Sequence, residues 1–200
     1  MSTMEETKVV TDSVEVENKA TLELLEGAIT HAHKDKDLYA LNSVQLESAG
    51  AGYLVARATD RYRLIEGKIE IEHGQLSPSL ISLEDTKRVI ALVKGNKLSR
   101  VTFNRIGDLL TVSVTGSSIT VQLLSGNFPA NFDELFTKNN KSVATDKASF
   151  NPAFFADYAK VAGKGKPVTV IFTGERMPMV IEVAGERVEW RALLMPMRTI

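Results

Sequence analysis

Residues 80–124 read LISLEDTKRVIALVKGNKLSRVTFNRIGDLLTVSVTGSSITVQLL. Apolar side chains recur at helical spacing over residues 83–94, and Ser82 with Asp85 three residues later forms a variant of the capping box, which predicts a helix start here. Alternating apolar residues then predict three strands, at 100–104, 109–114 and 119–124. The stretch therefore predicts a unit of one helix followed by β-strands.

The same order of elements occurs before and after this stretch, as a unit of roughly 65 residues that is present three times. In the first unit, Val10, Val14 and Val16 predict a strand, and Thr21 is a plausible N-cap of the helix that follows. In the third unit a strand is predicted at 142–149 and a helix start at Asn151-Pro152. The remaining predicted strands are 39–47, 53–58, 63–71, 168–172, 179–183 and 188–194.

Three short helices on many strands predict an α+β fold in which the helices lie on one face of antiparallel sheets. The loop 125–140 separates the second unit from the third, since it carries Gly126, Pro129 and several Asn. We predict a flexible N-terminal tail over residues 1–7, a complete domain of two units over 8–126, a connector over 127–141 and a C-terminal half-domain over 142–200.

The composition limits the class of protein. The chain has 200 residues, of which 44% are hydrophobic, so it can bury a core without metals or disulfides. Cysteine is absent, which favours a cytoplasmic location, and no apolar run approaches the roughly 18 residues of a membrane span. The formal net charge of −1 does not by itself indicate a nucleic-acid-binding protein.

No catalytic pattern is present in the sequence. Residues 163–166 lack the upstream glycine and the Ser or Thr of a phosphate-binding loop, and there is no nucleophile elbow. His31 and His33 are two residues apart in a predicted helix, so they point to nearly opposite sides, and we expect ordinary surface histidines. We therefore predict a protein that is not an enzyme and has neither a metal nor a cofactor.

Basic residues lie on the outer faces predicted for the three helices, away from their apolar stripes. Such residues are either an ordinary solvated surface or a surface for a polyanion. They are Lys34, Lys36, Lys87, Arg88, Lys94, Lys160 and Lys164.

The C-terminal residues Met195-Pro196-Met197-Arg198 combine two adaptable side chains, a rigid proline and a guanidinium. Methionine-rich surfaces suit the binding of varied partners, although methionines at this spacing can equally close the core. Spacing alone leaves both interpretations open.

Five motifs resemble the bacterial DNA polymerase III β sliding clamp family in order and spacing. Residues 41–47, LNSVQLE, and 58–64, ATDRYRL, are similar to its middle domain, and 126–129, GNFP, to its inter-domain connection. Residues 150–162 resemble the helix in the second half of its last domain, and 195–198, MPMR, its C-terminal signature. The family's first domain and the first half of its last domain have no counterpart in the resemblance, which covers roughly residues 18–198.

The resemblance implies a hydrophobic pocket that receives short peptide motifs of the polymerase, the clamp loader and repair proteins. Arg61 stands where the family usually has glycine, and Asp133 or Glu134 falls near a position that is often basic in the family. The matching pocket residues are Leu41, Thr59, Tyr62, Arg63, Leu64, Pro129, Pro178, Leu193, Met195, Pro196, Met197 and Arg198.

The resemblance also implies a ring around duplex DNA, whose inner wall is made of helices with basic residues. Phosphate contacts of this kind are independent of sequence and sensitive to salt. The seven basic residues named above are the candidates, and Tyr39 matches a DNA-proximal loop position. Rings of this family contain twelve helix-and-sheet units, so three units per chain favour a tetramer, with a dimer, a trimer or an incomplete ring also open.

Two functions follow from the resemblance. The first is a polymerase processivity factor that encircles DNA. The alternative is a clamp-derived adaptor or decoy that binds clamp-interacting motifs without encircling DNA, which the missing parts of the family architecture suggest. The compact chain suggests, by analogy, a variant from a phage or a mobile element.

Overall fold

The computed structural model describes residues 12–50, 52–96, 100–128, 131–139, 141–145, 147–163 and 165–197. The first unit contains β1 (Ser13–Glu17), α1 (Asn18–Ala28), β2 (Ser43–Ala49), β3 (Tyr53–Thr59), β4 (Arg63–Glu70) and β5 (His73–Gln75). The second contains β6 (Ser79–Ser82), α2 (Leu83–Gly95), β7 (Arg100–Ile106), β8 (Leu109–Val114) and β9 (Ser117–Gln122). The rest contains α3 (Phe132–Lys138), α4 (Pro152–Ala162), β10 (Val168–Ile171), β11 (Met179–Ala184) and β12 (Glu189–Leu194).

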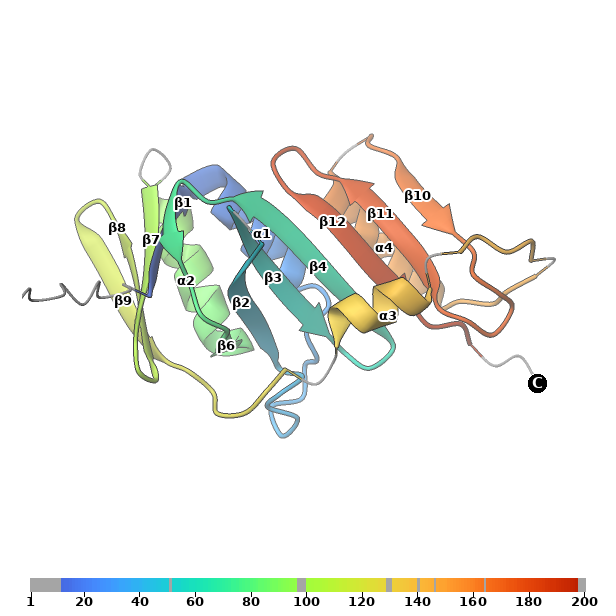
Figure 1. Ribbon diagram of the computed structural model, residues 1–200, viewed down its shortest axis with the longest axis horizontal. Helices are drawn as coiled ribbons and strands as arrows, with labels where there is room; N and C mark the ends of the chain where they lie inside the picture. The colour runs from blue at the N-terminus through green and yellow to red at the C-terminus, as the bar shows by residue number, and fades with distance from the viewer. Residues whose placement is uncertain are drawn as a thin grey trace, which may run out of the picture.

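The strands form two antiparallel sheets, one in the order β5-β1-β7-β8-β9 and the other in the order β10-β11-β12-β4-β3-β2-β6. Helices α1 and α2 pack against each other and each contacts strands of both sheets. Helices α1 and α4 lie on one side of the larger sheet and α3 lies on the other (Figure 1). This arrangement confirms the predicted α+β fold class.

The first two units exchange their leading strands. Strand β1 pairs with β7 of the second unit, with Val16 opposite Val101, and β6 pairs with β2 of the first unit, with Ile81 opposite Val44. The third unit joins the larger sheet differently, because its last strand, β12, pairs with β4 over six residues. One continuous sheet therefore crosses from the first unit to the third.

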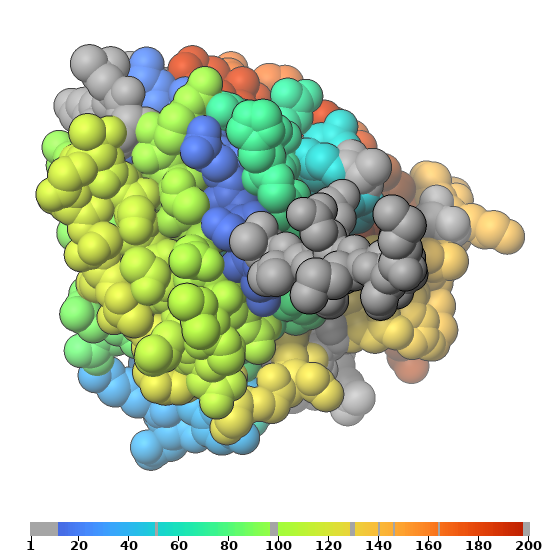
Figure 2. All heavy atoms as spheres, turned by 60° about the vertical axis from the view of Figure 1, so that its left-hand side comes forward, coloured from blue at the N-terminus to red at the C-terminus, as the bar shows by residue number. Residues whose placement is uncertain are grey.

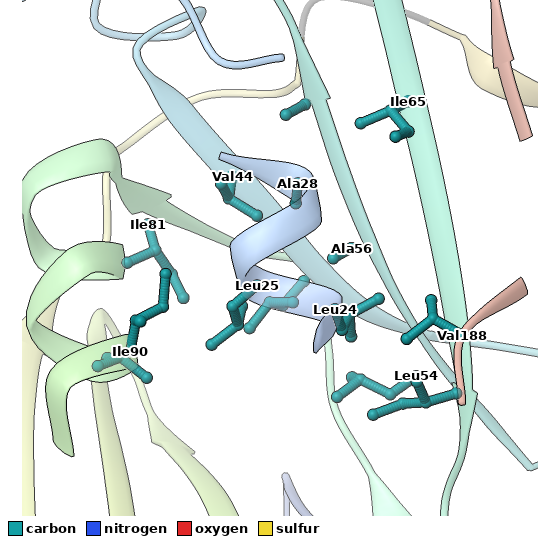
Figure 3. Packing of buried hydrophobic residues seen from close by; sticks show 14 of the residues in the cluster. Leu24, Leu25, Ala28, Val44, Leu54, Ala56, Ile65, Ile81, Ile90 and Val188 are labelled. Atoms are coloured by element: carbon teal, nitrogen blue, oxygen red, sulfur yellow. The ribbon is translucent and has the colours of Figure 1, made fainter. Parts of the chain in front are cut away.

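The main core lies between the helices and the sheets. In the close view, Leu24 and Leu25 of α1 point into this layer, and Ile90 of α2 approaches from the other side (Figure 3). The third unit is fixed to this core by Trp190 of β12. An ideal Cβ at Gly27 of α1 would lie 2.4 Å from its indole ring, and one at Gly67 of β4 would also lie 2.4 Å away, so only glycine fits on either side.

Two predicted element starts are wrong, each for a local reason. Helix α1 starts at Asn18 with Glu17 as its N-cap, because the Glu17 carboxylate accepts from the backbone N–H of Ala20. The predicted cap, Thr21, instead donates its hydroxyl to the carbonyl of Glu17. The strand predicted at 39–47 starts only at Ser43, after turns that occupy residues 36–41. Val10 lies outside the described residues.

Two further differences concern the stretch before α4. The loop predicted at 125–140 contains helix α3, which Asn131 caps by accepting from the backbone N–H of Glu134. No strand forms among the described residues of 142–149. The leading strands of the first two units each pair with the other unit, whereas no strand is present beside residues 147–149 within the described part of the chain. The carbonyl of Ser149 accepts from the backbone N–H of Met197 over 2.7 Å, but without a neighbouring strand the segment does not form the ladder that defines a strand.

His31 is fully buried, which contradicts the expected surface position. Helix α1 ends before it, and its Nδ1 lies 2.7 Å from the Thr30 hydroxyl while its ring centroid lies 5.1 Å from that of Tyr158. Burial, with a smaller effect of the nearby Arg63 cation, lowers the pKa of His31 to about 3, and Asp157 opposes this shift only in part. His31 is therefore neutral in the folded protein at any pH near neutrality.

This burial predicts a loss of stability in mild acid. The unfolded chain binds a proton at His31 near its ordinary pKa of 6.5, whereas the folded protein does not until about pH 3. The stabilisation that the protein gains from a neutral His31 is therefore complete above pH 6.5. As the pH falls from 6.5 towards 3, this stabilisation decreases by about 1.4 kcal/mol per pH unit. Urea unfolding of wild type and His31→Gln at pH 7 and pH 5 measures it, with the exposed His73→Gln as control. Equal pH dependence in wild type and His31→Gln would contradict this account.

Candidate functional site

A hollow of about 440 Å³ lies where the β3–β4 turn, the end of β12 and helix α3 meet. Its floor is made by Leu64 and Leu193, which are directly opposite each other in the β4–β12 ladder and are both buried. Phe132 and Phe136 of α3 belong to the same small apolar cluster. A floor of this kind offers buried aliphatic surface to an apolar side chain that enters from solvent.

The β3–β4 turn is held by its own side chains. The Asp60 carboxylate accepts from the backbone N–H groups of Tyr62 and Arg63, and the Thr59 hydroxyl donates to the carbonyl of Arg63. Arg61 has a φ of 82°, in the left-handed region that favours glycine. The structure thus gives a physical reason why the resembling family usually has glycine at this position.

The rim of the hollow carries exposed apolar side chains. Tyr62 is 61% exposed and Met195 is 43% exposed, and the backbone N–H of Met195 donates to the carbonyl of Tyr62 over 2.8 Å. This hydrogen bond holds the C-terminal segment against the β3–β4 turn. Leu135 of α3 and Pro178 line the same hollow. Two exposed apolar side chains beside an aliphatic floor suit a peptide with adjacent apolar anchors.

The structure brings together eight of the twelve predicted pocket residues: Leu41, Thr59, Tyr62, Arg63, Leu64, Pro178, Leu193 and Met195. Pro196 and Met197 instead line a neighbouring hollow with residues 147–149, 175 and 176, which Met195 also borders. Pro129 and Arg198 lie outside the described residues. Leu135 was missed because α3 was not predicted, although Phe132, Leu135 and Phe136 have helical i, i+3, i+4 spacing.

Arg63 borders the hollow, but its guanidinium points into the protein. It donates to Asp60 over 2.9 Å, to Asp157 of α4 over 2.7 Å and to the carbonyl of Thr30 over 2.8 Å, and it lies 4.3 Å from the ring centre of Phe154. Burial acts to raise the pKa of Asp157, but hydrogen bonds from Lys160 and Arg63 outweigh it and hold this pKa below its usual value. Arg63 therefore connects β4 to α4 behind the pocket.

The predicted DNA-facing residues are exposed where the structure describes them, but several of them are paired with carboxylates. The Lys36 ammonium lies 2.7 Å from the Glu84 carboxylate, and its hydrogen bond to that carboxylate raises the pKa of Lys36. The other pairs are Arg88 with Asp85 at 2.7 Å, Lys94 with Glu26 at 3.4 Å and Lys160 with Asp157 at 2.8 Å. Exposed ion pairs of this kind contribute little to stability, and they reduce the net positive charge of the surface.

The remaining predicted DNA-facing residues differ in position. Lys87 is exposed on α2. Lys34 and Lys36 were predicted at the end of the first helix, but α1 ends at Ala28, so both lie beyond it, as does Tyr39. They lie in the loop between α1 and β2, which protrudes from the lower side of the molecule (Figure 2). Lys164 lies outside the described residues.

The whole chain has the architecture of known structures. It superposes on a DNA polymerase III β subunit of Thermotoga maritima with a TM-score of 0.77 at 18% identity, covering 100% of this chain and 70% of that chain. This chain has the fold of the bacterial sliding clamps. A DNA polymerase III β chain of Streptococcus pneumoniae gives 0.77 at 16% identity, with 99% and 67% covered. A Pseudomonas aeruginosa sliding clamp gives 0.74 at 15% identity, with 100% and 69% covered.

Sequence comparisons add nothing to this likeness: no protein-family model matches the chain, and no curated protein matches it. Within the described ranges, no group of three or more His, Asp or Glu side chains is placed to hold a metal ion. No helix in the described part of the chain is long and apolar enough to cross a bilayer.

Proposed function

We propose that this chain is a sliding clamp, a non-enzymatic processivity factor that encircles duplex DNA as a homo-oligomeric ring and binds DNA polymerase and clamp-loader peptides. The observation that carries the proposal is the hollow over Leu64 and Leu193. It lies at the junction of the two-unit domain and the third unit, where the resemblance implies the peptide pocket. The clamp fold of the whole chain supports this assignment.

The helices supply the surface for DNA in this proposal. Outer residues of α2 and α4, among them Lys87, Arg88 and Lys160, are exposed and basic, although acidic partners lie beside two of them. A nearly balanced surface attracts phosphate weakly, which suits a protein that must slide. Retention on DNA would then depend on ring closure rather than on tight binding.

The adaptor or decoy remains the second candidate, because this chain spans only about 70% of the β subunit of Thermotoga maritima. Such a protein would use the same pocket without closing around DNA. Peptide binding tests what the two functions share, and retention on circular DNA separates them.

The pocket predicts strong effects of single changes at its rim. Met195→Glu and Tyr62→Ala should each weaken binding of a fluorescein-labelled peptide with adjacent Leu and Phe anchors by more than about 30-fold, because truncation or charging of a central anchor costs about 2 kcal/mol or more. Fluorescence anisotropy measures this affinity. Both side chains are exposed, so the fold should be retained, whereas charging the buried Leu64 would unfold the floor.

Met177→Glu is the matched control, since Met177 is 45% exposed and does not line the pocket. This variant should bind the peptide as the wild type does. Unchanged affinity in both Met195→Glu and Tyr62→Ala would refute the pocket assignment.

A further inference from the structure

Within the described residues, the third unit has no partner half of the kind that the first two units provide for each other. Its helix and strands can be compared with theirs position by position, because each helix starts from an N-cap, at Glu17, Ser82 and Asn151. Seven and eleven residues after the cap, all three helices have buried side chains. These are Leu24 and Ala28 in α1, Val89 and Val93 in α2, and Tyr158 and Ala162 in α4.

The positions one, four and eight residues after the cap behave differently. They are buried in α1, as Asn18, Thr21 and Leu25, and in α2, as Leu83, Thr86 and Ile90. In α4 the same positions are Pro152, Phe155 and Ala159, and all three are exposed. Phe155 is 41% exposed. The side of α4 that corresponds to the α1–α2 contact is therefore apolar and largely exposed, apart from an edge contact of Phe155 with Phe150, whose ring centres lie 6.3 Å apart.

The sheet of the third unit shows the same gap. Strands β2 and β7 are each covered on one edge by the leading strand of the other unit, whereas β10 is the last strand of its sheet. Val168 of β10 packs against the main core, so by alternation Val170 also faces the helix side. Val170 is 36% exposed, while Leu46 of β2 and Phe103 of β7, at the matching positions, are completely buried.

The third unit also carries the piece that would cover such an edge. In the first two units, the residue before the N-cap lies opposite the first inward residue of the other unit's strand: Val16 opposite Val101, and Ile81 opposite Val44. The corresponding pair in the third unit is Phe150 and Val168. In an antiparallel register the next inward pair is Ala148, two residues before Phe150, and Val170, two residues after Val168. One chain thus holds both a leading segment and an open edge.

We propose that the third units of two copies complete one another. Residues 147–150 of each copy run antiparallel along β10 of the other, with Ala148 opposite the second copy's Val170, and the two α4 helices pack across a two-fold axis. A second copy is the occupant because one contact supplies both missing parts at once, in the geometry that the first two units already show. The exposed Phe155, Val170 and Phe172 are buried in this contact.

This inference rests on the proposed function, because the contact between two copies would help to build the ring. Its tests contain no DNA, so a failure of two chains to associate is distinct from a failure to encircle DNA. A pair of chains joined in this way contains six units. Two pairs contain the twelve units that the resemblance implies for a ring, with the free edge of β9 left for the contact between pairs.

Cysteine cross-linking tests the register directly, because the chain contains no cysteine. Ala148→Cys and Val170→Cys should each remain uncross-linked alone under mild oxidation. Mixed in equal amounts they should give a disulfide-linked dimer on a non-reducing gel, since directly opposed residues have Cβ atoms about 5 Å apart. Thr169→Cys, one residue away and facing the other side of the sheet, should not cross-link with Ala148→Cys. Absence of a mixed dimer, or equal cross-linking by Thr169→Cys, would overturn the inference.

Charging the uncovered face provides the second test. Phe155→Glu should at least halve the solution mass measured by light scattering, while Ala91→Glu on the exposed side of α2 should leave it unchanged. Phe155 is partly exposed in the single chain, so its replacement should not unfold the protein, and circular dichroism checks this. A wild type that stays monomeric, or a Phe155→Glu variant with the wild-type mass, would overturn the inference.

Discussion

Trp190→Ala should lower the free energy of unfolding by about 3–5 kcal/mol, as large aromatic deletions in a packed core do. The indole of Trp190 is buried between Gly27 of α1 and Gly67 of β4 and fixes β12, and with it the third unit, to the two-unit domain. Urea denaturation followed by circular dichroism measures the change. A loss below about 1 kcal/mol would mean that the third unit is held by other contacts.

A second substitution tests the close contact between Gly67 and the Trp190 indole. Gly67→Ala should destabilise the wild type by about 1–3 kcal/mol or more, since an added Cβ would lie 2.4 Å from the indole. In the Trp190→Ala background the same change should cost much less, because the ring is gone and the remaining close contact, 2.8 Å to Cδ1 of Leu24, is with the end of a flexible side chain. Equal effects in both backgrounds would show that Gly67 and Trp190 do not interact.

Arg63→Met should cost about 3 kcal/mol or more of stability. The change leaves Asp60 and Asp157 without the guanidinium that both accept from, and removing one partner of a buried ion pair leaves an uncompensated charge. Asp157 keeps its contact with the exposed Lys160, which limits the loss. Arg63→Lys should restore little of it, since an ammonium cannot reach three acceptors in a planar fork.

The measurement is again urea denaturation, with Arg61→Met as the control because Arg61 is exposed on the same turn. Asp157→Asn should be less damaging in the Arg63→Met background than in the wild type, because the carboxylate that it removes is then only partly paired. Additive losses in this cycle would contradict a direct contribution of the Arg63–Asp157 pair.

Much of the fold follows from short-range patterns. The helix that begins at Leu83 was predicted from its capping pattern, and Leu109–Val114 was predicted with its observed bounds, because alternation and turn glycines are local features. Helix α3 was missed because its seven residues follow a loop rich in Asn and Gly. The strand expected at 142–149 does not form, because a strand depends on a partner that local pattern does not reveal.

The pocket was predictable in part, from the family resemblance and not from local patterns. The resemblance placed Leu64, Leu193 and Met195 together from distant parts of the chain, and the β4–β12 pairing does bring them to one hollow. The inward direction of the Arg63 guanidinium and the burial of His31 could not be predicted. Both depend on the position of α4, which approaches from the third unit.

The central claim is that this chain closes around duplex DNA, and its most direct test is retention on circular DNA. The protein is loaded onto a nicked plasmid with a clamp loader or by incubation at high concentration, and the complex is isolated by gel filtration. A restriction enzyme then cuts the plasmid once. We expect the protein to stay on the circle and to leave the linear DNA; equal retention on both forms, or none on the circle, would contradict a sliding clamp.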